Sequence, residues 1–456
     1  MSSAYEDFLK SKQRRFQGAG FDMDTGAYPF LYDFQARMLS WSCSKGRSAI
    51  FADCGLGKTP LQLAWADSIA RKSDKPVLIF APLAVSHQTQ REGEKFGIPV
   101  NIARESADIR PGVNITNYEK LEHFTPVGLG GIVLDESSIL KSYGGKTRQL
   151  LTDFAQSIEY RLCCTATPAP NDLIEICNHA EFLGVLNSKE IIALFFRQDG
   201  NTTHEWRLKG HAKADFWKWL ASWAMAVRKP SDLGFDDGRF TLQPLNIVQH
   251  TVDGHIAEGV LFPIEALTLQ EQAHARRESL YERVGRCAAI VNDSADPWVV
   301  WCNLNCESEA LKAAIPGAVE VTGSDSDEHK TTSMLGFSAG QFRVIISKPS
   351  ICGWGMNWQH CHNMAFTGLS HSFEQFYQAI RRCYRFGQTK PVTAHVIVAE
   401  TEGAVRDNIH RKEIEVSQMM EELVRHIGSE YNNARDDGRY KGAMAVGVPS
   451  FLKRCV

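Results

Sequence analysis

The sequence predicts an α/β protein with two tandem parallel-sheet domains and a helical insertion between them. Short apolar strand-like runs alternate with helix-like segments in two stretches, one before about residue 184 and one after about residue 285. Most of these runs are continuously apolar, which is typical of strands that are buried on both faces of a parallel sheet. The residues between the two stretches break the alternation and are rich in tryptophan, histidine and charge.

Length and composition are those of an ordinary globular protein. A chain of 456 residues has room for about three domains. Hydrophobic residues make up 43% and charged residues 23% of the chain, and the formal net charge is −3. This charge argues against a histone-like positive surface. It leaves nucleic-acid binding open, because backbone amides and helix N-termini also bind phosphates.

Cysteine spacing and the N-terminus bear on the cellular compartment. Twelve cysteines are present without a Cys-x-x-Cys pair, and the cluster His360-Cys361-His362 lacks a second cluster at metal-ligand spacing. Buried thiols in a reducing compartment are the simplest interpretation. The first residues show no signal pattern, and no apolar run has the length of a membrane span. We expect a cytoplasmic protein without membrane contact, or a nuclear one if the source is a eukaryote.

The first predicted elements are two helices. Residues 4–16 form a short helix pattern with a basic end, for which a solvated face is the default interpretation. Residues 28–41 carry an apolar stripe at helical spacing. This second helix includes Gln35.

The run Ala52-Asp-Cys-Gly-Leu-Gly-Lys-Thr59 follows a predicted strand at 47–52 and opens a predicted helix at 60–70. A strand, a glycine loop and Gly-Lys-Thr at a helix start form the layout of a phosphate-binding P-loop. Backbone N–H groups of the loop and the helix dipole would hold phosphate oxygens. The loop residues predicted to do this are Cys54, Gly55, Leu56 and Gly57.

The last two residues of this run carry the predicted chemistry. Lys58 would contact the β- and γ-phosphates, and the Thr59 hydroxyl would bind Mg²⁺. Gln35, shortly before the loop strand, could read both edges of an adenine with its amide. Ala52 stands where the consensus has its first glycine. A glycine-rich turn that binds no nucleotide is the alternative on these residues alone.

Further strands and helices continue the first domain. Asp135-Glu136 directly follow the predicted strand residues 131–134, at the sheet edge where ligands of parallel sheets bind. Asp135 would bind Mg²⁺ together with Thr59, and Glu136 would orient and deprotonate the attacking water. Thr165-Ala-Thr-Pro168 ends another strand, and its hydroxyls could couple the nucleotide site to an inter-domain cleft. The predicted strands are 76–82, 99–103, 113–116, 131–136 and 160–165, with a helix at 83–96.

The region from about 187 to 282 is interpreted as an insertion and linker. Helical patterns are expected around 212–226 and 265–286. Its tryptophans are more typical of a core than of stacking platforms for bases.

A second α/β unit begins near residue 297. A long charged helix is expected at 402–427, followed by an irregular tail. The predicted strands are 298–302, 319–323, 343–347, 363–366 and 392–398, with a helix at 307–315. The predicted domains are therefore 1–184, 185–284 and 285–400, followed by a C-terminal helix and tail at 401–456.

Residues 378–388 supply a third candidate for nucleotide chemistry. If this segment is helical, Gln378, Arg382 and Arg385 fall on one face. Aimed at a γ-phosphate, they would supply transition-state charge. A basic helix that contacts other phosphates or solvent is the alternative. The turn at 353–357, which contains Gly355, is a second candidate phosphate-contacting loop.

These runs resemble, in register from about residue 32 to 398, the motifs of superfamily-two helicase-type ATPases, specifically the SWI/SNF-like DNA translocases. Leu31-Tyr-Asp-Phe-Gln35 resembles the adenine-reading Q motif, and residues 50–59 resemble motif I, whose family form often lacks the first glycine. Residues 134–138, 165–171 and 299–302 match motifs II, III and IV. Residues 352–357 and 378–388 resemble motifs V and VI, and Arg385-Phe-Gly-Gln-Thr-Lys-Pro391 is the most branch-specific piece.

The resemblance implies two RecA-like domains that face one another across ATP and Mg²⁺, with duplex DNA as the partner. Residues 81–83 and 115–118 resemble the DNA-contacting motifs Ia and Ib. The compact chain looks like bacteriophage or prophage members, so a bacterial or phage-infected cytoplasm is expected, and protein partners from DNA replication, recombination or repair are possible. The residues predicted to contact nucleic acid are Pro82, Thr116, Asn117, Thr167, Thr322 and Gly323.

The sequence differs from the family motifs at three places and contains one fragment that resembles a different kind of site. Ser137-Ser138 replace the usual end of motif II, Arg381 stands where an acid is common, and Trp354 is bulky for motif V. Glu328-His-Lys330 looks like a nuclease fragment but lacks the preceding strand and acid, so a surface loop is favoured. A non-catalytic nucleic-acid-binding subunit with a degenerate ATPase core and an RNA helicase stay open as alternatives.

Overall fold

The computed structural model describes residues 20–436, except 83–84, 142–144, 199–205, 254–275, 354–355, 371 and 401–402. The chain divides into two compact units. Unit 1 comprises residues 1–237 and 416–456, and unit 2 comprises residues 238–415. The helix predicted at 4–16, the irregular tail beyond residue 436 and two of the singled-out residues, Trp354 and Gly355, lie outside the described residues.

Unit 1 is built on a seven-stranded parallel sheet with the strand order β3-β4-β2-β5-β6-β1-β9. Its central strands are buried along their whole length, which explains their unbroken apolar sequences. The strands are β1 (Arg47–Ala52), β2 (Val77–Ala81), β3 (Val100–Ile102), β4 (Val113–Asn117), β5 (Gly131–Asp135), β6 (Tyr160–Thr165) and β9 (Ala224–Val227).

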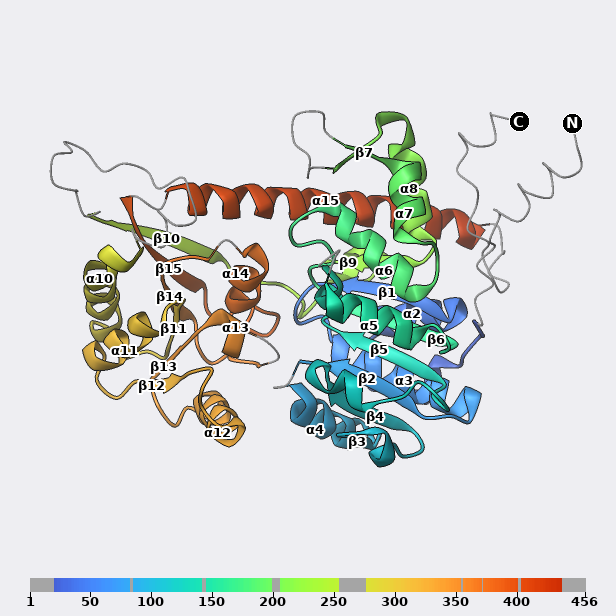
Figure 1. Ribbon diagram of the computed structural model, residues 1–456, viewed down its shortest axis with the longest axis horizontal. Helices are drawn as coiled ribbons and strands as arrows, with labels where there is room; N and C mark the ends of the chain where they lie inside the picture. The colour runs from blue at the N-terminus through green and yellow to red at the C-terminus, as the bar shows by residue number, and fades with distance from the viewer. Residues whose placement is uncertain are drawn as a thin grey trace, which may run out of the picture. The chain divides into compact units, whose positions relative to one another are not determined.

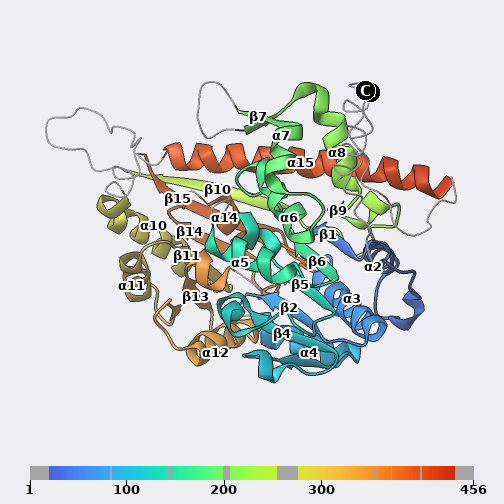
Figure 2. The ribbon, with the colours of Figure 1, turned by 45° about the vertical axis from the view of Figure 1, so that its right-hand side comes forward.

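Helices cover both faces of this sheet. On one face α3 packs against α2 and α4, whereas α5, α6 and α7 form a group on the other. Figures 1 and 2 show α5 and α6 in front of the sheet, and the sheet thus has the doubly wound layout that the sequence predicts. The helices are α2 (Asp33–Lys45), α3 (Lys58–Ser73), α4 (Ser86–Phe96), α5 (Lys146–Ala155), α6 (Ile176–Leu183), α7 (Ser188–Phe195) and α8 (Lys213–Ala221).

The region interpreted as an insertion contributes a strand to each sheet. β9 pairs with the P-loop strand β1, and β10 (Leu245–Val252) pairs with β15 of unit 2. The expected helix at 212–226 is wrong in its second half, because α8 ends at Ala221 and the chain turns into β9. A hairpin of β7 (Phe196–Gln198) and β8 (Trp206–Leu208) lies before α8. The first half of the helix expected at 265–286 lies outside the described residues, and α10 begins at Leu280. The domain boundaries stay a prediction.

Three tryptophans of this region lie in the core of unit 1, as their interpretation as core residues predicts. Trp217, Trp219 and Trp223 are buried, and the ring of Trp219 packs on Phe195 and on Trp223. The aromatic cluster therefore holds α7, α8 and the start of β9 together.

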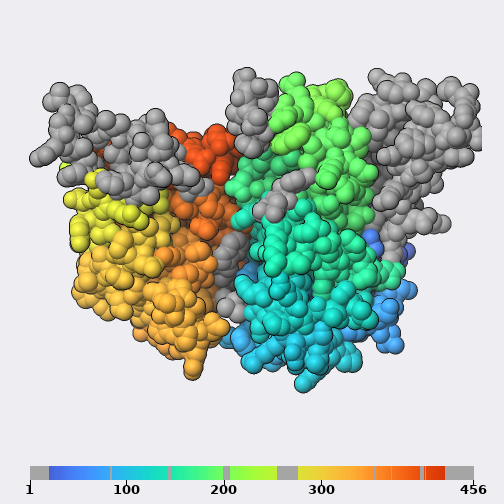
Figure 3. Space-filling model, viewed as in Figure 1, coloured from blue at the N-terminus to red at the C-terminus, as the bar shows by residue number. Residues whose placement is uncertain are grey.

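Unit 2 contains a six-stranded parallel sheet with the order β10-β15-β14-β11-β13-β12. The yellow to orange surface of this unit in Figure 3 includes α10, α11 and α12. The two parallel sheets with their helices confirm the predicted class of two tandem RecA-like domains. Besides β10, the strands are β11 (Trp298–Cys302), β12 (Val319–Val321), β13 (Val344–Ser347), β14 (Asn363–Thr367) and β15 (Val392–Ala399). The helices are α10 (Leu280–Asn292), α11 (Asn305–Ala314), α12 (Asp327–Ser338), α13 (Pro349–Cys352) and α14 (Phe373–Ile380).

The long helix predicted after the last strand is α15 (Gly403–Asp436). Its first part belongs to unit 2, and its residues from Val416 onward belong to unit 1. There Glu421 pairs with Arg228 at 3.2 Å, and the His426 ring stacks on Trp217. None of the helices in the described ranges combines the length and the apolar character needed to span a bilayer.

A fully buried ion pair holds unit 2 together. Arg283 Nη1 on α10 lies 2.6 Å from Glu307 Oε1 on α11 and also donates to the carbonyl of Thr367 at the end of β14. Gly368 follows with φ +85°, and a Cβ there would lie 2.7 Å from Arg283 Nη1. The guanidinium therefore fixes two helices and a strand end at one point.

We expect Arg283→Met to lower the free energy of unfolding of unit 2 by about 3–5 kcal/mol, because it leaves the Glu307 carboxylate buried without its counter-charge. Urea denaturation monitored by tryptophan fluorescence measures this change. Lys312→Met is the matched control, since its pair with Glu320 is 58% exposed on the lysine side and should cost less than about 1 kcal/mol. Equal effects of the two substitutions would contradict the prediction.

Candidate functional site

The ends of β5, β6 and β1 form one row at the carboxyl edge of the first sheet. Asp135 of β5 is paired with Cys164 of β6, and Cys164 is paired with Ile50 of β1. The P-loop begins two residues after Ile50, so the loop and the acidic pair emerge from the same edge. This is the position at which parallel α/β sheets bind ligands.

The P-loop has the backbone that its glycines predict. Gly55 and Gly57 have φ values of +88° and +77°, which residues with a Cβ rarely adopt. Gly57 caps α3, which begins at Lys58 with Thr59 in its first turn. The Lys58 ammonium donates to the carbonyl of Ala52 at 3.0 Å, so it folds back over the loop.

The backbone at Ala52 does not require a glycine. It is the last residue of β1 and is paired with Val227 of β9. Among the described non-glycine residues, only Asp74 and Glu136 have positive φ. The next residue, Asp53, donates its N–H to the carbonyl of Val227 at 3.0 Å. The missing first glycine is thus accommodated by continued strand pairing.

Gln35 packs against the P-loop. Its Nε2 donates to the carbonyl of Leu56 at 2.8 Å, and its Oε1 accepts from the N–H of Tyr32 at 3.0 Å. A Cβ on Gly57 would lie 2.2 Å from Gln35 Nε2, so the loop glycine also makes room for this amide. The contact with adenine stays a prediction.

The two carboxylates of motif II have different surroundings. Asp135 is buried, and its Oδ1 accepts a hydrogen bond of 2.7 Å from Gln62 Nε2. Burial raises the pKa of the Asp135 carboxyl to about 6, and the charge of Glu136 acts in the same direction, whereas Gln62 and Lys58 oppose it. Sequence reasoning missed Gln62, although its position one turn after Thr59 on α3 is a usable signal.

Glu136 has a strained backbone and a bonded side chain. Its φ is +56°, in the left-handed region that non-glycine residues rarely adopt. The Thr165 hydroxyl donates to Glu136 Oε2 at 3.3 Å and accepts from the N–H of Thr167 at 3.1 Å. Motif III is therefore connected to the second carboxylate of motif II through a hydroxyl.

Lys58 stays cationic beside these acids. Burial alone lowers the pKa of its ammonium, but the Cys54 sulfur and the carboxylates of Glu136, Asp135 and Asp53 outweigh burial and raise the pKa above its ordinary value. The oxygen ligands predicted here, the Thr59 hydroxyl and the Asp135 carboxylate, suit magnesium. Proteins bind this ion through one or two carboxylates together with substrate phosphates. Within the described ranges no three His, Cys, Asp or Glu side chains gather as a larger metal site.

The helical face predicted in motif VI is wrong beyond its first residue. Gln378 lies on α14, but the helix ends at Ile380, and the turn that follows carries Arg382 and Arg385. In this turn the carbonyl of Arg382 accepts a hydrogen bond of 3.0 Å from the N–H of Trp358. Gln378 and Arg382 nevertheless meet, because Arg382 Nη2 donates to Gln378 Oε1 at 3.1 Å.

The two arginines differ in their surroundings. Arg382 is buried and donates from Nη1 to the carbonyl of Met356 at 2.8 Å, which connects motif VI to motif V. Arg385 is half-buried and makes a longer contact of 3.4 Å to the same carbonyl. Arg382 is thus placed to support the structure, and Arg385 has the more accessible guanidinium.

The predicted nucleic-acid contacts lie in different environments. Thr116, Asn117 and Thr167 are buried, Pro82 and Thr322 are half-buried, and Gly323 is exposed. Each of the three buried residues has a side-chain oxygen without a hydrogen-bond partner among the described residues. Their contact with nucleic acid stays a prediction.

The nuclease-like fragment Glu328-His-Lys330 lies in the first turn of α12, so the surface loop expected for it is wrong for these residues and holds only for the segment before Asp327. Asp325 accepts from the N–H of Thr322 at 2.7 Å, and Lys330 donates to the carbonyl of Gly323 at 2.9 Å. The charged side chains of this segment therefore stabilise the turn between β12 and α12.

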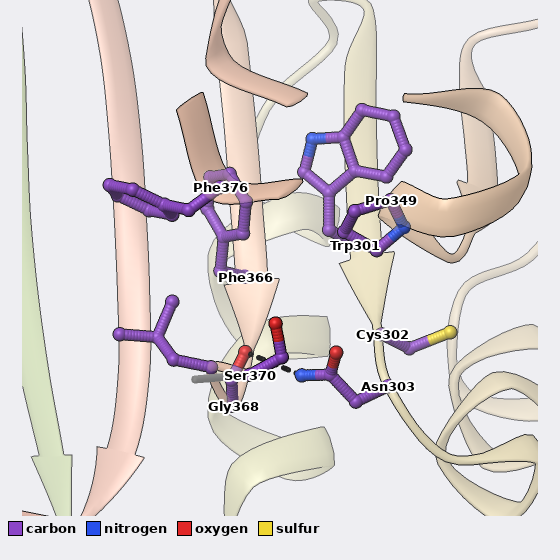
Figure 4. A pocket seen from close by; sticks show the side chains of 9 residues that line it. Trp301, Cys302, Asn303, Pro349, Phe366, Gly368, Ser370 and Phe376 are labelled. Carbon is purple, nitrogen blue, oxygen red and sulfur yellow. Dashed lines mark hydrogen bonds between the residues drawn. The ribbon is translucent and has the colours of Figure 1, made fainter. Parts of the chain in front are cut away.

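A small pocket lies at the carboxyl edge of the second sheet, where β11 and β14 end (Figure 4). Its lining is largely apolar and includes Trp301, Phe366 and Phe376. Asn303 crosses it and donates to the carbonyl of Gly368 at 3.2 Å. No predicted site residue lines this pocket.

No protein-family model matches the chain. Protein p41 of Acyrthosiphon pisum secondary endosymbiont phage 1 is 25% identical over 424 residues, which cover 78% of this chain and 89% of p41. The CHD3-type chromatin-remodeling factor CHR7 of Arabidopsis thaliana is 24% identical over 213 residues, which cover 40% of this chain and 17% of that protein.

The chain resembles the SWI2/SNF2 ATPases. The match to a chromatin-remodeling factor confirms the resemblance that the motifs predict. Among solved structures, the SWI2/SNF2 ATPase core of Sulfolobus solfataricus in complex with dsDNA aligns with a TM-score of 0.41 and 18% identity, over 81% of this chain and 88% of that one.

A buried histidine next to motif II gives unit 1 a predicted pH dependence. His179 Nε2 lies 3.1 Å from Ser137 Oγ, and burial lowers the pKa of its imidazole to about 4. The unfolded chain takes up this proton below about pH 6.5, whereas the folded chain does so only near pH 4. Stability should therefore fall by about 3 kcal/mol as the pH decreases through this window.

His179→Gln should flatten this part of the stability curve, measured as urea unfolding at a series of pH values. His123→Gln, which changes an exposed histidine of the same unit, should leave the slope unchanged. A slope that is the same in all three proteins would show that His179 does not cause the acid sensitivity.

Proposed function

We propose that this protein is an ATP-dependent DNA translocase or helicase that couples ATP hydrolysis to movement along DNA, with duplex DNA favoured. One observation carries the proposal: a P-loop lysine and two adjacent carboxylates emerge from one row of strand ends, and motif III bonds the second carboxylate. Such a set is what phosphoryl transfer to water needs, namely phosphate positioning, a metal ligand and a base.

Each residue of the set has a distinct task in this proposal. The loop from Cys54 to Gly57 turns its backbone amides toward phosphate oxygens, and Lys58 neutralises their charge. Thr59 and Asp135 would hold Mg²⁺, which when bound would offset the negative charge that develops on the phosphate. Glu136, held by Thr165, orients the attacking water and accepts its proton.

Unit 2 supplies the arginines in this proposal. The resemblance implies that Gln378, Arg382 and Arg385 act on the same nucleotide as the P-loop. Arg385 is the better candidate for contact with the γ-phosphate, since Arg382 is buried against Gln378 and Met356. Hydrolysis would then change the relation between the two units, and the DNA-contacting segments would move along the phosphate backbone.

The nature of the DNA partner rests on the relatives. The solved archaeal core is a complex with dsDNA, and one relative is a chromatin-remodeling factor. A non-catalytic subunit with a degenerate ATPase core is the rival function. The residues that argue against it are the intact Lys58, Glu136, Arg382 and Arg385. Single-stranded DNA and RNA remain alternative substrates for the test. Protein partners from DNA replication, recombination or repair and a cytoplasmic location stay predictions.

The decisive experiment measures ATPase turnover with no nucleic acid, single-stranded DNA, duplex DNA, forks and RNA, together with triplex displacement for translocation. We expect the largest stimulation with duplex DNA. Glu136→Gln should lower the stimulated turnover by at least about a hundredfold, because it removes the general base, while DNA binding is retained. Glu94→Gln changes an exposed acid on α4 and serves as the control. Undiminished turnover in Glu136→Gln would refute the assignment.

Arg385→Ala should reduce turnover by about a thousandfold or more, with a much smaller change in nucleotide affinity, as for an arginine that contacts the transition state. Steady-state kinetics and binding of a fluorescent ATP analogue separate the two quantities. Arg411→Ala, which removes an arginine exposed on α15, controls for the loss of positive charge. A loss of nucleotide affinity at unchanged turnover would show that Arg385 does not contact the transition state.

A further inference from the structure

Tyr118 connects the end of β4 to motif II across the intervening strand. It follows Asn117, the last residue of β4, and β2 separates β4 from β5 in the sheet. The Tyr118 hydroxyl reaches past the end of β2 and donates to the carbonyl of Asp135 at 2.7 Å. Its ring stacks on Phe80 of β2, with centroids 6.0 Å apart.

This bond acts on the peptide that precedes Glu136. The carbonyl of Asp135 and the nitrogen of Glu136 belong to the same planar peptide group. A hydrogen bond to this carbonyl oxygen therefore fixes the orientation of the peptide that leads into Glu136. The φ angle of Glu136 is +56°. A left-handed glutamate persists only where its surroundings enforce it, and Tyr118 is one enforcing contact.

Glu136 has further contacts among the described residues, and one of them is a hydrogen bond from its backbone N–H to the Asp135 carboxylate. The N–H of Ile139 bonds its carbonyl at 3.2 Å, and Thr165 bonds its carboxylate at 3.3 Å. The Tyr118 bond is shorter than either and is buried. Burial also raises the pKa of the Tyr118 phenol well above 10, so the group remains a donor at all ordinary pH values.

The residues just before Tyr118 carry polar groups that the described part of the fold does not satisfy. Thr116 Oγ1 and Asn117 Oδ1 are buried polar atoms without a hydrogen-bond partner among the described residues. Asn114, earlier on the same strand, has its amide bonded to Asn101, Arg110 and other backbone groups. The Asn114 side chain therefore serves the fold, whereas the Thr116 hydroxyl and the Asn117 amide oxygen keep unused hydrogen-bonding capacity at the buried carboxyl end of β4.

We propose that Tyr118 is a positioning residue that transmits nucleic-acid contact at Thr116 and Asn117 to the left-handed Glu136. Binding of a phosphate backbone at the end of β4 shifts or stiffens this segment, and the phenol carries the change to the Asp135 carbonyl. Glu136 is then held where it can act on the attacking water. This inference rests on the proposed function, because it explains how DNA would stimulate hydrolysis.

Tyr118→Phe tests the link, since it removes one hydroxyl and keeps the ring on Phe80. We expect the DNA-stimulated kcat to fall about fivefold to tenfold, the rate equivalent of one lost hydrogen bond, with KM for ATP and DNA affinity unchanged. The ratio of stimulated to basal turnover should fall with it. Tyr28→Phe is the matched control, because it removes another buried phenol of unit 1, one that bonds Asp67 and Ser68.

A second measurement reads the backbone directly. Hydrogen exchange of the amides at residues 136–139 should become faster in Tyr118→Phe than in the wild-type protein and in Tyr28→Phe. Thr116→Val should weaken stimulation by DNA but leave this exchange unchanged, because the Tyr118 bond is intact.

The outcomes separate the two proposals. Unchanged exchange together with an unchanged stimulation ratio in Tyr118→Phe would overturn the coupling and leave the proposed function standing. A wild-type protein whose ATPase does not respond to any nucleic acid would overturn the proposed function and this coupling with it. A rise in KM alone would also contradict a positioning role.

Discussion

The candidate site of unit 1 depends on two neighbouring carboxylates at the sheet edge, one buried and one half-buried. Asp135 and Glu136 are adjacent in the chain, and burial and mutual repulsion raise the pKa of Asp135 to about 6. Such a pair is costly unless positive charge and hydrogen bonds offset it. Lys58 supplies the charge, and Gln62 and Thr165 supply bonds. The donor set that results has the chemistry to attract a divalent cation with its phosphates.

Residues outside the P-loop and the acidic pair hold this arrangement in place. Gln35 fastens Leu56 of the P-loop, Gln62 fixes Asp135, and Tyr118 fixes the peptide between the two acids. β9 extends the sheet beside β1 and bonds the start of the loop. A catalytic set of this kind needs such support, because small displacements of reacting groups are expensive in rate.

Much of the fold and of the first half of the site was predictable from local sequence. The continuous apolar runs correctly predict most strands, and Gly-Lys-Thr correctly predicts where α3 begins. Other features depend on distant partners. β9 and β10 lie in a stretch without α/β alternation and become strands by pairing with β1 and β15. The end of α14 at Ile380 and the bond between Arg382 and Trp358 beyond it are features that helical periodicity cannot reveal.

The sequence by itself determined which chemical groups this protein can bring to a nucleotide: a phosphate loop, a lysine, two carboxylates and two arginines in motif order. Residue type and spacing encode these groups, because a loop glycine or a strand-end acid acts through its own geometry. Only the tertiary structure decided that Ala52 is harmless, that Glu136 is left-handed, and that Tyr118 reaches it. These facts depend on strand order and on contacts between residues far apart in the chain, which no local pattern records.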